Sequence, residues 1–160
     1  MNTTSATSLL LNVLPNSMGN GIKVIPSFTS RVTREPLRVV EDMSAWLEKI
    51  TLPLHADTDK MLSVSYPEDS TSACFDRQRL GGSLLEMIKV SIDAAKRYVL
   101  VKMDVVKNEI TLTLDQDQPL NDLRPLSELL EVVDAHHGYI EQTESHLGGT
   151  RFQIHLPVLA

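Results

Sequence analysis

The sequence is poor in the residue types that would cross-link the chain or make it basic. Cys74 is the only cysteine among 160 residues, which excludes an intramolecular disulfide and a cysteine-based metal site. Lysine and arginine total 15 against 21 aspartate and glutamate residues, so the formal net charge is -6. Because binding to nucleic-acid phosphates needs a basic surface, this balance argues against a nucleic-acid partner.

The sequence also lacks a hydrophobic run long enough to span a bilayer. The apolar patch near the N-terminus extends only from Leu9 to Leu14 and has no basic region before it. It therefore predicts neither a secretion signal nor a membrane span. Together with the single cysteine, this favours a reducing compartment, and we expect a cytoplasmic protein without membrane insertion.

Length and hydrophobic content indicate one domain. A chain of 160 residues with 42% hydrophobic residues is long enough for one core and too short for two ordinary domains. We interpret residues 1–34 as an N-terminal tail. Within it, "IKVIPSF" predicts a possible edge strand, because Pro26 interrupts the run. Residues 35–160 form the predicted domain.

The period of the apolar residues predicts a first helix and a strand. Apolar side chains recur at steps of three and four over residues 37–50, which places them on one helical face. Pro36 suits the first turn of this helix, and Pro53 is expected to end it. Residues 60–67 alternate apolar and polar side chains and predict a half-buried strand. Residues 68–75 are expected to form an irregular connector.

The rest of the chain predicts a helix, a hairpin, a helix and a hairpin. Asp76 suits the N-cap of the second helix, and alternation on both sides of a turn at Lys107 predicts an antiparallel hairpin. Pro125 begins a third helix, and residues 138–157 form the last hairpin. We therefore expect an α/β (α+β) two-layer sandwich, with a mostly antiparallel mixed sheet and the helices on one face.

The segment "VVDAHHGYIEQTESHLGGTRFQIHLP" resembles the C-terminal half of the ATPase domain of sensor histidine kinases, the Bergerat or GHKL fold. In that family a helix ends in a Glu-Ala-His-Gly-Gly-like stretch, and Gly-Thr-x-Phe precedes the final strand. The matching residues here are Asp134, Ala135, His136 and Gly138 for the first motif, and Gly149, Thr150, Arg151 and Phe152 for the second. Residues 67–88 resemble the family's strand-to-helix run, with Asp76, Arg79, Leu80 and Leu84 in register. The resemblance covers roughly residues 35 to 158.

The resemblance implies three nucleotide-binding elements, and the first is a magnesium ligand. The family's second helix carries an asparagine that coordinates the magnesium bridging the phosphates. Registering Asp76 and Leu80 places Val90 at this position and Glu86 one turn earlier. Because magnesium requires oxygen ligands, valine cannot hold it.

The second implied element is an aspartate followed by a Gly-x-Gly turn, which reads the adenine amino group. Asp115 or Asp117 would supply the carboxylate, but Gln118, Pro119 and Leu120 occupy the place of the glycines. Side chains there fill space that the base needs. Asp115 and Asp117 also lie two apart at a strand end, where they could hold a cation, although solvated turn acids are the more common arrangement.

The third implied element is a long lid followed by a glycine-rich helix start, whose N–H groups bind the phosphates. Only a few residues separate Pro119 from the third helix in this chain. Leu123 and Pro125 stand where the glycines belong. Because proline has no backbone N–H, we expect the phosphate cradle to be lost.

The five histidines do not have the spacing of a metal site. His136 and His137 are adjacent at the end of a helix. Histidine kinases carry a phospho-accepting histidine on a helical hairpin before the ATPase domain, and the first 35 residues here contain no histidine. We therefore interpret the histidines as surface residues.

These departures predict a catalytically inactive histidine kinase ATPase-like domain over residues 35–160. It would act as a protein-interaction or regulatory module in bacterial two-component or phosphorelay signalling. We expect no catalytic residue, no metal and no cofactor. The expected partner is a histidine kinase or a response regulator, and a homodimer is possible. Two alternatives stay open: an ATP- and magnesium-binding kinase domain that uses Glu86, Asp115 and Asp117, or a phosphotransferase that uses His136 or His137.

Overall fold

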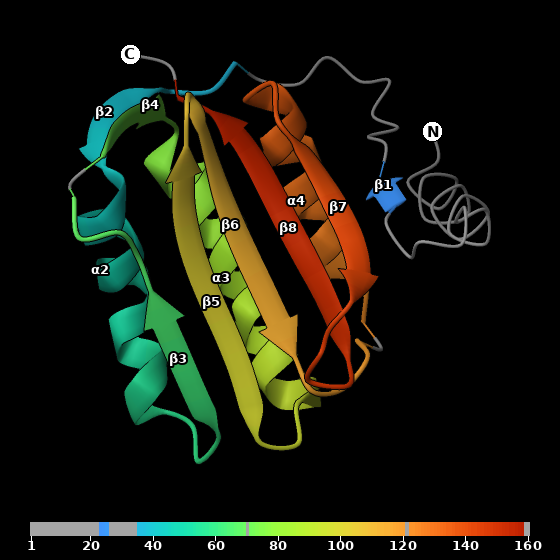
Figure 1. Ribbon diagram of the computed structural model, residues 1–160. Helices are drawn as coiled ribbons and strands as arrows, with labels where there is room; N and C mark the ends of the chain where they lie inside the picture. The colour runs from blue at the N-terminus through green and yellow to red at the C-terminus, as the bar shows by residue number, and fades with distance from the viewer. Residues whose placement is uncertain (1–22, 26–34, 70, 121, 159–160) are drawn as a thin grey trace.

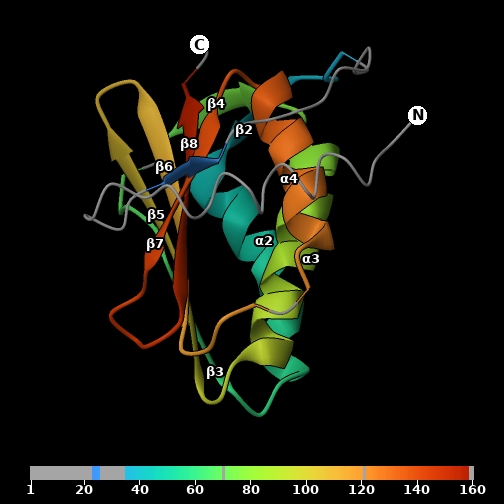
Figure 2. The same ribbon diagram turned by 90° about the vertical axis from the view of Figure 1, so that its right-hand side faces the viewer.

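A six-stranded sheet covered by three helices makes up most of the structure. The computed structural model describes residues 23–25, 35–69, 71–120 and 122–158. The elements are β1 (Lys23–Ile25), β2 (Val39–Asp42), α2 (Met43–Ala56), β3 (Met61–Ser65), β4 (Ser72–Phe75), α3 (Arg77–Ala94), β5 (Tyr98–Val106), β6 (Glu109–Gln116), α4 (Arg124–Ala135), β7 (Tyr139–Glu144) and β8 (Thr150–Pro157). Figures 1 and 2 show α2, α3 and α4 on one side of the sheet, which confirms the expected α/β class and layering.

The strand order of the main sheet is β1, β7, β8, β6, β5, β3, and β2 pairs with β4 in a separate two-stranded sheet. Among the described strands, only β3 and β5 pair in parallel. The expected hairpins β5–β6 and β7–β8 are present and lie next to each other through the β6–β8 pairing. Lys107 takes a positive φ of 57° in the tight β5–β6 turn. Strand β1, within the segment "IKVIPSF", pairs antiparallel with β7 at one edge of the sheet.

The core lies between the sheet and the helices because each element turns its apolar face inward. The core face of β6 and β8 carries Ile110, Leu112, Leu114, Phe152, Ile154 and Leu156. The helices contribute Leu80, Leu84 and Ile88 from α3 and Leu126, Leu129, Leu130 and Val133 from α4. Full burial of one such side chain contributes about 1.5–3 kcal/mol to folding, so this layer is the main source of stability.

Helix α2 begins and ends later than the sequence predicts. The residues before Met43 form β2, so the expected start at Pro36 is wrong. Asp42 caps α2 by accepting a hydrogen bond from the backbone N–H of Ala45, at 3.1 Å. The three- and four-residue spacing of apolar residues before Met43 predicted a helix wrongly, because these aliphatic side chains are exposed and do not form a buried helical face. The expected end at Pro53 is also wrong, because α2 continues through Pro53 to Ala56.

The irregular connector expected at residues 68–75 contains a strand. Strand β4 pairs antiparallel with β2, with Cys74 opposite Val40. Four residues are too few for their alternation to be recognised in the sequence. The Phe75 side chain is buried and meets the Trp46 ring edge-on, with the ring centroids 4.9 Å apart. The two-stranded sheet is therefore attached to the core through α2.

Replacing Gly138 by alanine will destabilise the fold. The added Cβ would lie 2.1 Å from the carbonyl oxygen of His155 and 3.1 Å from Cγ1 of Val133, so the backbone would have to shift. We expect the free energy of unfolding in urea to fall by about 2–3 kcal/mol. The matched control is Gly82→Ala in α3, where the added Cβ meets open space and should raise stability by about 0.5–1 kcal/mol. Equal effects of the two substitutions would contradict this packing.

Candidate functional site

Glu86, one of the three carboxylates that the sequence singles out, lies on the exposed surface of α3. Its Oε1 is 3.6 Å from Nζ of Lys89, and both side chains are about half exposed. Such a solvent-exposed pair contributes at most about 0.5 kcal/mol. Val90, which the sequence resemblance places at the magnesium-ligand position, is partly buried in the same helix.

Asp115 is buried on β6 and forms an ion pair with the neighbouring strand. Its Oδ1 accepts a hydrogen bond from Nε of Arg151, at 2.9 Å. The two residues are direct partners in the β6–β8 register, so the pair lies across the ladder. The carboxylate thus has a basic partner within the fold.

Asp117, two residues later, anchors the connection from β6 to α4. Its carboxylate accepts hydrogen bonds from the backbone N–H groups of Lys96 (2.7 Å), Arg97 (2.8 Å) and Tyr98 (3.2 Å). Burial alone would raise the pKa of Asp117, but these N–H groups stabilise the charged form and lower the pKa below its usual value. The ionised side chain therefore fixes the end of β6 to the α3–β5 connection.

The three carboxylates have three different partners in the structure. Over residues 23–25, 35–69, 71–120 and 122–158, no group of three or more histidine, cysteine, aspartate or glutamate side chains converges as a metal site would. Asp115 and Asp117 share neither a partner nor a hydrogen bond in the described part of the chain.

The sequence interpretation missed Gln116, which lies between the two aspartates. Its side chain is completely buried, and neither Nε2 nor Oε1 has a hydrogen-bond partner among the described residues. The alternation of side chains along a strand could have identified Gln116 as a core-facing residue, because Leu112 and Leu114 lie on the core face and Gln116 is the next residue in this series. A buried amide without partners is costly, which makes this the least satisfied polar group at the end of β6.

The β7–β8 turn packs directly on the segment that follows β6. A Cβ added to Gly149 would lie 2.4 Å from the carbonyl oxygen of Gln116 and 2.5 Å from the backbone N of Gln118. Only glycine allows this approach. Further along the same connection, Leu120 and Leu123 are partly buried and pack against the hydrophobic core.

The start of α4 lacks a side-chain cap. Leu123 is at the N-cap position without a capping hydrogen bond, and proline follows within the first turn. Arg124 instead forms a two-pronged interaction with Asp122, whose pKa this hydrogen bonding lowers to about 2. The helix thus begins with an apolar residue at the position where the sequence resemblance implies a phosphate-binding turn.

His136 is buried, so the interpretation of all histidines as surface residues is wrong for this one. Its Nε2 accepts a hydrogen bond from the backbone N–H of Asp76, at 2.9 Å. Its Nδ1, assigned as protonated from this network, donates to the carbonyl oxygen of Val132, at 2.8 Å. His136 therefore joins the end of α4 to the start of α3. The neighbouring His137 is exposed, with a φ of 62°.

Asp76 extends this network to the segment before β2. Its carboxylate accepts hydrogen bonds from the N–H groups of Leu37 (3.0 Å) and Arg79 (3.1 Å). Burial would raise the pKa of Asp76, but these two N–H groups lower it below its usual value. Arg38 adds a hydrogen bond from its guanidinium to the carbonyl oxygen of Ala135, at 2.9 Å. Three segments thus meet at the capped end of α3.

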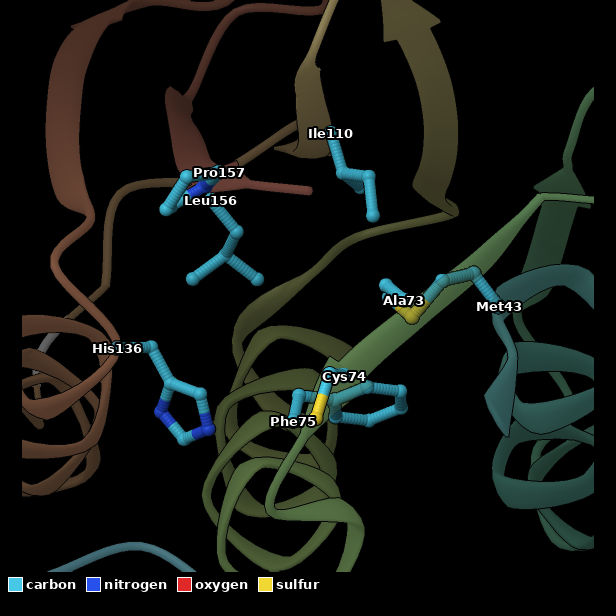
Figure 3. A pocket seen from close by; sticks show the side chains of 8 residues that line it. All are labelled: Met43, Ala73, Cys74, Phe75, Ile110, His136, Leu156 and Pro157. Carbon is cyan, nitrogen blue, oxygen red and sulfur yellow. The ribbon is translucent and has the colours of Figure 1, made fainter. Parts of the chain in front are cut away.

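A small hollow lies beside His136, between the two sheets. Figure 3 shows Cys74 and Phe75 of β4 across from Leu156 and Pro157 at the end of β8, with the His136 ring on a third side. The lining is mostly apolar. Because both nitrogens of His136 already have backbone partners, its ring has no free polar atom to offer a ligand here.

The pH dependence of stability will reveal the buried state of His136. Burial, the largest effect, lowers the pKa of His136, and the Arg38 guanidinium lowers it further, against the opposing effects of the Val132 carbonyl and the Asp76 carboxylate. The unfolded chain therefore binds a proton more readily. The contribution of neutral, buried His136 to stability is complete above about pH 6.5. It is lost as the pH falls from there toward the folded-state pKa of His136.

The measurement is urea unfolding of the wild type and of His136→Gln from about pH 5 to pH 7.5. The variant should lose this pH-dependent component, and the exposed control His137→Gln should keep it. Parallel pH profiles for the wild type and His136→Gln would contradict the assignment.

The fold, but not the sequence, has clear relatives. No family model matches the chain, and no curated protein matches it. Also, no helix in the described residues is both long and apolar enough to cross a membrane.

Several solved structures match with high TM-scores. The histidine kinase AdeS of Acinetobacter baumannii is 17% identical, with a TM-score of 0.66 over 79% of this chain and 70% of that one. The catalytic domain of the histidine kinase ThkA is 12% identical, with a TM-score of 0.68 over 76% and 96%. The ATP binding domain of PrrB from Mycobacterium tuberculosis is 16% identical, with a TM-score of 0.63 over 77% and 98%. The chain therefore has the fold of histidine kinase catalytic domains, as its sequence resemblance implied.

Proposed function

We propose that this chain is a catalytically inactive relative of the histidine kinase ATPase domain and acts by binding a protein. One observation supports the proposal: the β6–α4 connection, where the resemblance implies the nucleotide-binding turns, is engaged with the rest of the chain. Asp117 fixes one end of this connection, and Leu120 and Leu123 pack against the core.

The metal position does not suit a magnesium–nucleotide complex. Val90 offers no oxygen, and Glu86, one turn earlier, is exposed and paired with Lys89. Asp115 and Asp117 are held by Arg151 and by backbone N–H groups. Because a hard cation needs several oxygen ligands in one place, this arrangement supports the absence of a magnesium site.

Close packing and the start of α4 also support the loss of the base and phosphate sites that the resemblance implies. Gly149 lies so close to Gln116 and Gln118 that no room remains even for a methyl group between them. The start of α4 has no glycine turn, and Pro125 has no N–H for a phosphate oxygen. These features support loss of nucleotide binding as a whole rather than loss of one ligand.

We propose a partner from two-component signalling, in the cytoplasm of a bacterium. ThkA, whose catalytic domain shares this fold, has been solved in complex with the response regulator TrrA. A domain that keeps the scaffold without the nucleotide site retains surfaces for such contacts. The partner of this chain would be a response regulator or a histidine kinase in a phosphorelay.

A second candidate function rests on Gln116. Its buried amide has a donor and an acceptor without partners among the described residues, which is the arrangement expected where a small ligand completes the hydrogen bonds. This favours a domain with an altered nucleotide site that still binds ATP. A phosphotransferase role for His136 has less support, because both of its ring nitrogens are engaged with the backbone.

The purified chain should not bind ATP in the presence of magnesium. We expect no heat in calorimetry and no change in melting temperature at millimolar ATP, because a ligand of the folded state must raise that temperature. The positive control is the ATP binding domain of PrrB under the same conditions.

The variant Val90→Asn tests which feature prevents ATP binding: the missing oxygen ligand on α3 or the β6–α4 connection. It restores an oxygen ligand on α3 but leaves the β6–α4 connection in place, so it should remain unable to bind. Magnesium-dependent binding by the wild type would contradict the proposal and favour the second candidate, in which case Gln116→Leu should abolish the signal.

Binding to signalling proteins is tested directly with the purified histidine kinases and response regulators of the source organism. At least one should give a saturable signal with the immobilised chain in biolayer interferometry, at the micromolar affinity typical of transient signalling contacts. Failure of all of them would contradict the proposed pathway while leaving the nucleotide result intact.

A further inference from the structure

The buried ring of His136 joins three segments at one corner of the fold. Its Nε2 accepts a hydrogen bond from the backbone N–H of Asp76, the N-cap residue of α3, at 2.9 Å, and its Nδ1 donates to the carbonyl oxygen of Val132 in α4, at 2.8 Å. The Asp76 carboxylate in turn accepts a hydrogen bond from the N–H of Leu37, before β2, at 3.0 Å. We call these four residues, Leu37, Asp76, Val132 and His136, the His136 corner.

Hydrogen bonds rather than apolar packing hold the segment before β2 at the His136 corner. The Leu37 side chain is 66% exposed, so it contributes little to the core. The segment is instead held by the bond from Leu37 to Asp76 and by the bond from the Arg38 guanidinium to the carbonyl oxygen of Ala135, at 2.9 Å. Because such a segment can open without exposing much buried apolar surface, its release needs less free energy than global unfolding.

The hydrogen bond from Asp76 to His136 exists only for the neutral ring. Nε2 can accept a hydrogen bond only while it carries no proton itself, and both nitrogens of the imidazolium are donors. Protonation of Nε2 therefore places two N–H groups face to face. In Figure 3 the ring borders the hollow lined by Leu156 and Pro157, whose side chains have no acceptor for the added proton. The charged ring thus loses its partner at the start of α3.

The surroundings of the ring oppose its protonation while the corner is closed. The titratable or charged side chains on the elements packed around it, and beside it on the chain, are those of Arg38, Cys74, Asp76, Arg79, Asp134 and His137. Burial has the largest effect and lowers the pKa of His136. The Arg38 and Arg79 guanidiniums lower this pKa further, while the Val132 carbonyl and the Asp76 carboxylate raise it. Because the net effect lowers the pKa, a proton binds more readily to the exposed ring, and a falling pH favours the open corner.

We infer that the His136 corner is a pH-sensitive switch: a proton from solvent on Nε2 of His136 releases the start of α3 and the segment before β2 from the end of α4, while the sheet and the core stay folded. The bond that breaks first is the one from the Asp76 N–H. The bonds from Leu37 to Asp76 and from Arg38 to Ala135 are lost with it. None of these residues is in the β6–α4 connection, so failure of this inference would leave the proposed function untouched.

The test is native-state amide hydrogen exchange of the full chain from about pH 7.5 to about pH 5, in low concentrations of urea. Protection factors, which correct for the intrinsic pH dependence of exchange, are compared between the amides of Leu37, Asp76 and Arg79 and those in the middle of β6 and β8. The first three should lose about tenfold protection as the pH falls, because the exposed ring binds a proton with a pKa of about 6.5. Urea should hardly change them, since their exchange exposes little surface.

The variant His136→Gln removes the titrating group but keeps a side-chain carbonyl that can accept the Asp76 N–H. Protection of the three amides should then be the same at both pH values, and the exposed control His137→Gln should behave like the wild type. The comparison within the wild type decides alone if His136→Gln does not fold.

Two kinds of result would overturn the inference. At pH 5 the three amides of the wild type could exchange with the same free energy and urea dependence as the amides of β6 and β8, which would mean that the corner opens only when the whole fold does. Their protection could also stay constant with pH in the wild type, or fall equally in His136→Gln, which would mean that His136 does not control the opening.

Discussion

The hydrogen bonds that Asp117 accepts from three consecutive backbone N–H groups set the shape of the region on which function depends. They fix the end of β6 against the start of β5, and Gly149 packs on the same segment from the other side. The connection to α4 is therefore held at its β6 end, and Leu120 and Leu123 pack against the core further along it. The proposed loss of the nucleotide site rests on this constraint.

The scaffold around this connection is kept by different interactions from those that bind a ligand. The β5–β6 and β7–β8 hairpins and the stripes of α3 and α4 bury apolar side chains that need no nucleotide for their stability. His136 and Asp76 join α3, α4 and the segment before β2 through backbone hydrogen bonds. Such a fold can lose its ligand and keep its surfaces, which is the basis for proposing that it binds a protein.

The sequence predicted the long, strongly periodic elements and failed where periodicity is short or ambiguous. The two hairpins and α3 with its Asp76 cap followed from alternation and helical spacing. Strands β2 and β4 were missed, because four residues carry little pattern and the exposed aliphatics before α2 imitated a helix face. The burial of His136 depends on a contact with Asp76, 60 residues away, which no local pattern encodes. The interpretation focused on Asp115 and Asp117, although the period of two assigns the core face to Gln116.

The most direct test of the central claim is amide hydrogen exchange at Lys96, Arg97 and Tyr98, the donors to Asp117. If the β6–α4 connection is a fixed part of the fold, these three amides should exchange at least about 100-fold more slowly than unprotected amides, and Asp117→Ala should abolish the protection. Exchange at the rate of an unstructured chain in the wild type would mean that the connection opens freely, and would contradict a nucleotide site closed by its own residues.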